Sequence, residues 1–210
     1  MLRAAVIIDY QNIQTTGSQR FYPKDSPRKR SLNPTKFAEA LVSFRNSRVA
    51  DPALLASIEA IEVYRGLPSS ARDPKDNARN LEEQRRWSHD RRVKVVHRPL
   101  KYVFHNRQDN LGMGTRYFSK VEKGIDVLCA LAVVRNVKAE QIDLVILASH
   151  DSDLEPAIEE AVRISAGTVV ETVSWLNPEY KNSRSRLNPK TLKPIWNTSL
   201  GREQYDASVD

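Results

Sequence analysis

Two short apolar runs, far apart in the chain, each end in a group of acidic and amide side chains. The runs are residues 4–8 and residues 144–148. The polar side chains that follow them are Asp9 and Asn12 after the first, and Ser149, Asp151 and Asp153 after the second. A short continuous apolar run of this kind is typical of a strand that is buried on both faces, and such strands belong to parallel sheets covered by helices.

Segments with helical and strand patterns alternate along the rest of the chain. Helices are expected over 33–46, 76–90, 120–137 and 154–164, and strands over 57–66, 93–100 and 167–175. Asn33 is expected to cap the first helix, with Pro34 at its first position. Residues 17–32 have the composition of a polar loop, and residues 101–118 that of an excursion outside the core. The alternation predicts an α/β fold, a three-layer α/β/α sandwich with a mainly parallel sheet.

Length and composition set further limits. The 210 residues suit one domain, expected over residues 1–176, followed by a basic extension over 177–210. No apolar stretch approaches the roughly 18 residues of a membrane span, and the first apolar run is too short for a signal peptide. The single Cys129, expected in the core, rules out an intrachain disulfide and suits a cytoplasmic protein. The oligomeric state stays open, with a homodimer as one option.

Ligands of such sheets bind beyond the carboxyl ends of the strands, where the strand order reverses. If the two apolar runs are neighbouring strands, Asp9 and Asp151 share that edge. Asp126 begins an otherwise apolar helix, where a lone buried carboxylate would be costly. Each acid also has a structural interpretation. Asp9 and Asn12 could form a turn, Asp153 could serve a helix start, and Asp126 could face solvent.

Three motifs, "IIDYQNI", "KGIDVLCAL" and "VILASHDSDLEPAI", occur in the order and at the rough spacing of the NYN family of the PIN-like nuclease superfamily. The chain resembles this family over residues 4–175. The resemblance implies a PIN-like fold and a metal-dependent ribonuclease. Its implied catalytic residues are Asp9, Asn12, Asp126, Asp151 and Asp153, of which Asp9, Asp126 and Asp151 would bind the metal. The chain departs from the family pattern at His150 (often Gly), at Leu154 (often Phe), and at Ala130 and Ala132, where many members carry a further Asp.

The chemistry of phosphodiester hydrolysis agrees with this set of acids. The reaction requires an activated water and a group that stabilises charge on the phosphate oxygens. Mg²⁺ or Mn²⁺ supplies both while held by one or two carboxylates. One Cys and scattered His residues argue against zinc. Further candidates for substrate contact are Lys123, Ser149 and His150, although Lys123 could be a surface charge and His150 a loop residue.

Basic residues are concentrated between residues 85 and 107. They are Arg85, Arg86, Arg91, Arg92, Lys94, Arg98, Lys101 and Arg107. Trp87, Tyr102 and Phe104 are interleaved with them, and cations beside stacking rings suit a single-stranded nucleic acid. Together with the net charge of +7, this stretch predicts RNA as the partner and a basic surface on the same side as the acids, although charge alone does not separate RNA from DNA. The structural interpretation is a solvated helix face and a strand, with Trp87 in the core.

These observations leave two main functions open. The first is a metal-dependent endoribonuclease. The alternative is a non-catalytic RNA-binding protein on a PIN-like fold, suggested by the missing helix acid and the basic balance. A phosphatase with Asp9 as its nucleophile is disfavoured, because that chemistry wants a second Asp two residues later, where Gln11 stands. The RNA target and the cleavage preference are not determined by the sequence.

Overall fold

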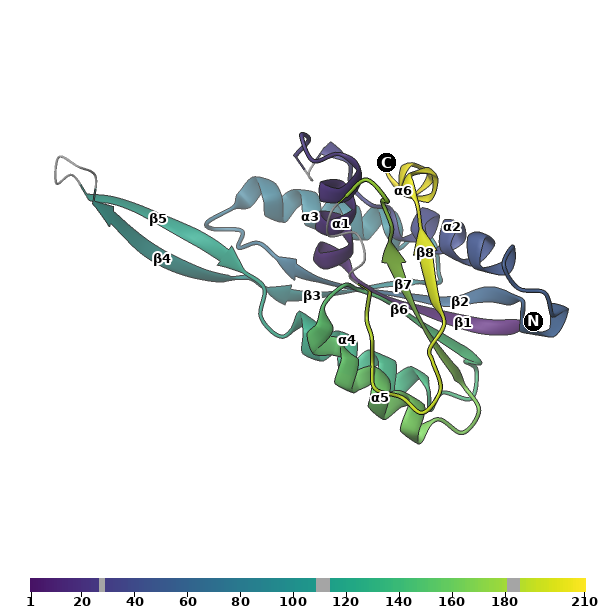
Figure 1. Ribbon diagram of the computed structural model, residues 1–210. Helices are drawn as coiled ribbons and strands as arrows, with labels where there is room; N and C mark the ends of the chain where they lie inside the picture. Colours follow the sequence, from purple (N-terminus) through teal and green to yellow (C-terminus); the bar gives the residue numbers. More distant parts are fainter. Residues whose placement is uncertain (27–28, 109–113, 181–185) are drawn as a thin grey trace.

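Six parallel strands form the central sheet of the computed structural model, which describes residues 1–26, 29–108, 114–180 and 186–210, with backbone only for 106–108 and 114–117 (Figure 1). The strand order is β3-β2-β1-β6-β7-β8. The strands are β1 (Leu2–Asp9), β2 (Ala56–Leu67), β3 (Val93–Pro99), β6 (Leu144–Ala148), β7 (Val169–Trp175) and β8 (Asn197–Leu200). All five pairings are parallel.

Helices cover both faces of this sheet, which confirms the predicted three-layer α/β/α architecture. On one face lie α1 (Tyr10–Phe21), α2 (Pro34–Asn46), α3 (Pro74–Trp87) and α6 (Arg202–Ser208), and on the other α4 (Ile125–Asn136) and α5 (Glu155–Ile164) (Figure 1). Two short 3-10 helices, η2 (Pro52–Leu54) and η3 (Ser152–Leu154), also belong to the described elements. Successive side chains of β1 point to opposite faces, so Val6 joins the core on the α1 side and Ile7 the core on the α4 side.

The two apolar runs identified in the sequence are the central neighbours β1 and β6. Ile8 pairs with Ala148 at their carboxyl ends. From β1 the chain proceeds outward through β2 and β3, whereas from β6 it proceeds in the other direction through β7 and β8. The strand order therefore reverses between β1 and β6, and ligands of doubly wound sheets bind at such a point.

The helix after β1 was not expected. The sequence indicated a polar loop over 17–32, but α1 continues to Phe21. Thr15, Thr16 and Gly17 are poor helix formers, and tertiary packing overrides their preference. The Phe21 ring packs edge-on against Trp175 with a centroid distance of 5.9 Å. The α2 prediction is confirmed, with Asn33 Oδ1 accepting hydrogen bonds from the backbone N–H groups of the first helical turn.

Residues 101–108 and 114–121 form a two-stranded hairpin outside the main sheet, in agreement with the excursion predicted over 101–118. Strands β4 (Lys101–Gln108) and β5 (Gly114–Val121) pair antiparallel and project from the body as an arm (Figure 1). The helix expected from residue 120 therefore begins only at Ile125, because residues 120–121 continue the β-ladder of the hairpin.

The boundary expected at residue 176 does not separate two units. Strand β8 extends the sheet beside β7, and Tyr205 of α6 is fully buried in the core on the α1 side. The polar, Pro-interrupted composition after residue 177 gave no local signal for β8 or α6. Both elements are stabilised by contacts with segments that are distant in the sequence. No helix within the described residues is long and apolar enough to cross a membrane.

Candidate active site

An open pocket of about 660 Å³ lies at the carboxyl edge of the sheet, beside the point where the strand order reverses. Four carboxylates from separate parts of the chain line it. They are Asp9 at the end of β1, Glu122 between β5 and α4, Asp126 in the first turn of α4, and Asp151 before η3. We call this space the acidic pocket. The structure therefore brings the three predicted metal ligands to one pocket and adds Glu122.

Asp9 is the most deeply buried of the four, with 5% of its surface exposed. The Ser149 hydroxyl donates a hydrogen bond of 2.9 Å to its Oδ2 atom. Burial is the main cause that raises the pKa of Asp9 to about 7; the negative charges of Glu122 and Asp151 contribute to the rise, and the Ser149 hydrogen bond opposes it. Asp9 therefore holds its negative charge at a considerable cost in the absence of a cation.

Glu122 was missed by the sequence reasoning. Its Oε1 atom accepts a 2.5 Å hydrogen bond from the backbone N–H of Gly66, and burial raises its pKa. The one sequence feature that could have placed Glu122 near the other acids is its position four residues before Asp126. That spacing indicates proximity on a helix, but Glu122 precedes α4 and reaches the pocket because the hairpin returns the chain there.

Asn12, Ser149 and His150 connect the segments around the pocket. Asn12 lines it, but its Oδ1 atom accepts a 2.8 Å hydrogen bond from the backbone N–H of His150. The His150 Nε2 atom in turn accepts one from the backbone N–H of Trp175. Ser149 Oγ accepts from the backbone N–H of Asp151 at 3.0 Å while donating to Asp9. These three side chains therefore position the loop after β6.

Asp153 lies outside the acidic pocket. It is exposed, and its backbone N–H donates to Asp151 Oδ1 at 3.1 Å. Asp151 is thus the N-cap of η3, and Asp153 is an acid in the first turn. The placement supports the structural interpretation of Asp153, because negative charge near the start of a helix is stabilising.

None of the four pocket carboxylates forms an ion pair with a Lys or Arg of the described residues. Elsewhere buried acids are paired, as Glu171 is with Arg45 at 2.8 Å. Lys123 is the one basic side chain among the described residues that line the pocket. Over the same part of the chain, no group of three or more His, Cys, Asp or Glu side chains is placed to hold one metal ion. The oxygen donors nevertheless suit a hard divalent cation, which requires only one or two protein carboxylates when water and phosphate complete its shell.

Two helices begin at the acidic pocket, and their N-termini favour anions. Helix α1 starts directly after Asp9, and α4 starts at Ile125. Unpaired backbone N–H groups and the helix dipole make such ends suitable for phosphate. Gly124, the N-cap of α4, has a φ of 76°, in the left-handed region. A Cβ atom there would lie 3.1 Å from Arg98 Nε, so Arg98 packs against this turn.

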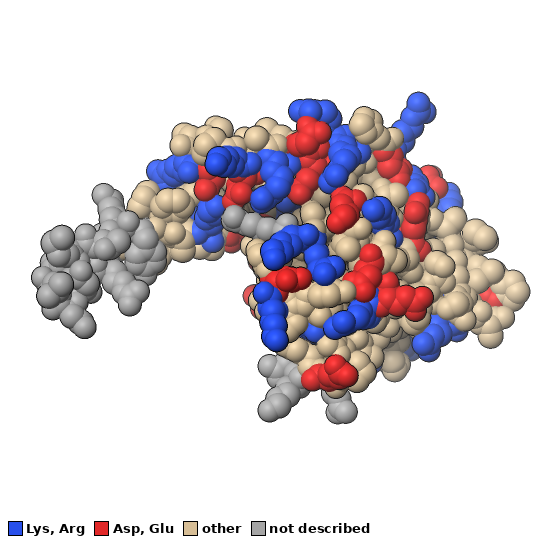
Figure 2. Space-filling view, turned by 90° about the horizontal axis from the view of Figure 1, so that it is seen from above, with Lys and Arg blue, Asp and Glu red and all other residues tan. Residues whose placement is uncertain are grey.

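The predicted basic stretch is divided between the two edges of the sheet. Arg91 and Arg92 precede β3 at its amino end, opposite the acidic pocket, and Arg92 pairs there with Asp90 at 2.7 Å. Arg85 and Arg86 lie in the last turn of α3, where Arg86 pairs with Asp210. Figure 2 shows basic and acidic side chains intermixed on the face that carries α1, α3 and α6. The expectation of one basic surface beside the acids is therefore wrong for these four residues.

The rest of the basic stretch is closer to the carboxyl edge. Arg98 lies near the carboxyl end of β3, and Lys101 begins the hairpin. Lys94 is exposed near the start of β3. The Arg107 side chain lies outside the described part of the structure. Trp87 is 2% exposed, which confirms its expected place in the core.

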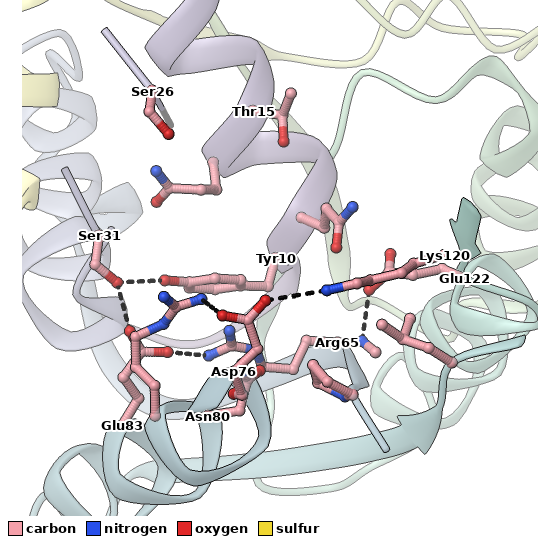
Figure 3. A pocket seen from close by; sticks show the side chains of 16 residues that line it. Tyr10, Thr15, Ser26, Ser31, Arg65, Asp76, Asn80, Glu83, Lys120 and Glu122 are labelled. Atoms are coloured by element: carbon pink, nitrogen blue, oxygen red, sulfur yellow. Dashed lines mark hydrogen bonds and ion pairs between the residues drawn. The ribbon is translucent and has the colours of Figure 1, made fainter. Parts of the chain in front are cut away.

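A second pocket of about 300 Å³ adjoins the first (Figure 3). We call it the side pocket. It shares Gln11, Thr15 and Glu122 with the acidic pocket. Arg65 lies on one wall, pairs with Glu83 at 2.7 Å and stacks over the Tyr10 ring with its Cζ atom 4.3 Å from the centroid. The two pockets therefore form one continuous polar surface at the carboxyl edge of the sheet.

Opposite charges in the side pocket are closely balanced. Lys120 reaches in from β5 and pairs with Asp76 at 3.1 Å (Figure 3). It also pairs with Asp73, which does not line the pocket, at 2.9 Å. Asn80 also lines the pocket, and its Oδ1 atom is buried with no hydrogen-bond partner among the described residues. The side pocket thus combines paired charges with a buried acceptor that is available to a ligand or a water molecule.

No match was found among protein-family models or curated proteins. The crystal structure of a protein of unknown function from Vibrio parahaemolyticus RIMD 2210633 is similar to this chain at 16% sequence identity and a TM-score of 0.47. The alignment covers 100% of this chain and 96% of the other. The resemblance to the NYN family therefore stays a prediction from the sequence motifs.

Proposed function

We propose that the protein is a metal-dependent endoribonuclease that hydrolyses RNA phosphodiester bonds at the acidic pocket with Mg²⁺ or Mn²⁺. One observation carries the proposal: four carboxylates from separate segments line one open pocket without an ion-pair partner in the described part of the chain. Burial raises the pKa of Asp9 to about 7. A protein maintains such a cluster at a cost in stability, and a bound cation would offset that cost.

Asp9, Asp126, Asp151 and Glu122 are the residues that would hold the ion, two of them at a time with water and a substrate phosphate. When bound, a divalent ion lowers the pKa of a water molecule and stabilises charge on the phosphoryl oxygens. The protein's own contribution is placement. The N-termini of α1 and α4 bind the phosphate, and the hydrogen bond from Ser149 keeps Asp9 directed at the pocket.

The test compares two substitutions that remove the same charge two residues apart. Asp151→Asn keeps an oxygen for the Asp153 N–H group, so the loop after β6 should remain folded. It should abolish cleavage of a mixed RNA pool in Mn²⁺ or Mg²⁺. The matched control Asp153→Asn should leave cleavage nearly unchanged, because Asp153 lies outside the pocket.

Three outcomes would contradict the proposal. Undiminished cleavage in EDTA would exclude a metal-dependent reaction. Equal losses in Asp151→Asn and Asp153→Asn would remove the specific role of the pocket. Tight RNA binding without cleavage in any divalent ion would favour the non-catalytic RNA-binding alternative. One observation is in favour of that alternative, since no three acidic or imidazole side chains of the described residues are arranged around one ion.

A further inference from the structure

The hairpin arm presents aromatic rings on one of its faces. Tyr102 pairs with Lys120 across the ladder, and Phe104 pairs with Phe118. Directly opposite residues and residues two apart on one strand share a face, so all four side chains lie on the same side. Phe104 is 47% exposed and Phe118 is 39% exposed. Large apolar rings exposed together in this way mark a binding surface more often than scattered single residues do.

The rings form a connected row with a cation above it. The Phe118 centroid is 5.3 Å from that of Tyr102 and 6.2 Å from that of Phe104. The Arg72 guanidinium lies over the same row, with its Cζ atom 5.1 Å from the Tyr102 centroid and 4.9 Å from the Phe104 centroid. We call Arg72, Tyr102, Phe104 and Phe118 the aromatic track.

The aromatic track leads into the two pockets. The Tyr102 hydroxyl donates to Asp73 Oδ2 at 2.7 Å and accepts from the backbone N–H of Ser69 at 2.8 Å, which fixes the base of the arm to the body. Lys120, on the same face, lines the side pocket. Two residues later, Glu122 lines both pockets. Exposed rings, side pocket and carboxylates are therefore consecutive along one path.

We propose that the aromatic track binds single-stranded RNA by stacking its bases and directs the strand through the side pocket to the acidic pocket. Residues 101–121 carry Lys101, Arg107, Arg116 and Lys120 against one acid, Asp109, and this balance complements a polyanion. Every base has a flat face that stacks on an aromatic ring, so such a platform accepts many sequences. The identity of the substrate rests on the proposed function, whereas binding by the aromatic track does not require cleavage.

A second copy of the chain is a weaker candidate for this surface. A fully buried aromatic side chain covers roughly 150–250 Å², and Phe104 and Phe118 expose less than half of theirs. Two such rings provide far less than the approximately 800 Å² per partner of a stable interface. The small area and the excess of basic residues favour a nucleic acid strand.

The experiment measures binding of a labelled oligouridine of about 16 nucleotides, the long strand, in EDTA. Phe104→Ala combined with Phe118→Ala should weaken binding of the long strand about tenfold or more, because the stacked bases lose the rings that hold them. Phe104→Leu combined with Phe118→Leu should weaken it similarly, since leucine keeps apolar area but offers no ring. Leu131→Ala, at a site on α4 that is 57% exposed and outside the aromatic track, is the matched control and should have no effect.

Several results would contradict the proposal that the aromatic track binds RNA. Unchanged binding of the long strand by the alanine variant would exclude it. Full retention by the leucine variant would indicate apolar docking instead of stacking, and loss of a dimer without loss of RNA binding would indicate a protein interface. The two proposals fail separately. If the track binds RNA but no divalent ion supports cleavage, only the proposed nuclease function is excluded. If RNA is cleaved and the ring substitutions have no effect on binding, only the proposed role of the track is excluded.

Discussion

Replacing Asp9 by Asn should stabilise the metal-free protein, and the stabilisation should grow between about pH 4 and about pH 7. Burial raises the pKa of Asp9 from the ordinary 3.8 to about 7. The folded protein therefore binds the Asp9 proton more tightly than the unfolded chain does. In the wild type this stability penalty is absent below pH 4, grows as the pH rises, and is complete above about pH 7.

The size of the effect follows from the two pKa values. The difference between about 7 and 3.8 corresponds to at most about 4 kcal/mol, since one pKa unit is 1.36 kcal/mol. For a chain of this length that free energy corresponds to roughly 10 °C in Tm. The amide in Asp9→Asn can still accept the Ser149 hydrogen bond, so the packing of the site should be kept.

Thermal and urea unfolding of both proteins in EDTA at pH 5 and pH 8 would measure the difference. Asp9→Asn should be clearly more stable than the wild type at pH 8, and the difference should fall to less than half of that value at pH 5. Asp153→Asn, an exposed substitution with the same change in charge, should shift both values little. Mg²⁺ should raise the stability of the wild type at pH 8 and should not raise that of Asp9→Asn.

A pH-independent difference between wild type and Asp9→Asn would refute this reasoning, because a raised carboxyl pKa requires the two curves to converge in acid. A destabilised Asp9→Asn at pH 8 would show that the carboxylate itself is needed to hold β1, α1 and the loop after β6 together. In that case its charge would be balanced within the folded protein, and the acidic pocket would not need a cation.

Three further substitutions test the packing that positions the site, each by urea unfolding. Asn33→Ala should cost about 1 kcal/mol, because its Oδ1 atom caps two N–H groups of α2. Arg45→Met should cost about 3–5 kcal/mol, since it leaves Glu171 buried without its partner. Gly17→Ala should cost about 1–3 kcal/mol, because its Cβ atom would lie 2.6 Å from the Tyr205 ring and force α1 away from α6.

Two of these substitutions have a matched control. Asn33→Asp should retain most of the α2 cap, since a carboxylate oxygen accepts the same hydrogen bonds. Arg163→Met breaks an exposed pair with Glu160 and should leave stability nearly unchanged, because water screens such a pair. Unaltered stability of Gly17→Ala would mean that α1 can shift without disturbing the core.

Most of the central sheet and four of its covering helices were predictable because their signals are local; they are β1, β2, β3, β6, β7, α2, α3, α4 and α5. Five consecutive apolar residues describe β1 and β6 well, and Asn33 followed by Pro34 marks the start of α2. The prediction that Asp9 and Asp151 share one edge required β1 and β6 to be neighbours. The pairing of Ile8 with Ala148 shows that they are. Local pattern also placed Trp87 and Cys129 correctly in the core.

The composition of the acidic pocket was only partly predictable. Asp9, Asp126 and Asp151 were found because each follows a recognisable strand or begins a helix. Glu122 was missed because a hairpin, rather than a helix turn, returns it to the pocket. Asp153 had the right spacing, but the turn of η3 directs it to solvent.

The sequence by itself determined the alternation of strands and helices, because burial of apolar residues has a period that can be counted along the chain. Only the tertiary structure decided which polar residues meet. Arg92 and Arg98 are six residues apart, yet β3 carries them to opposite edges of the sheet. Strand β8 and helix α6 complete the core although their own residues are largely polar. Their positions depend on contacts with β7 and α2. The free energy of contacts between distant segments cannot be deduced from a local sequence pattern.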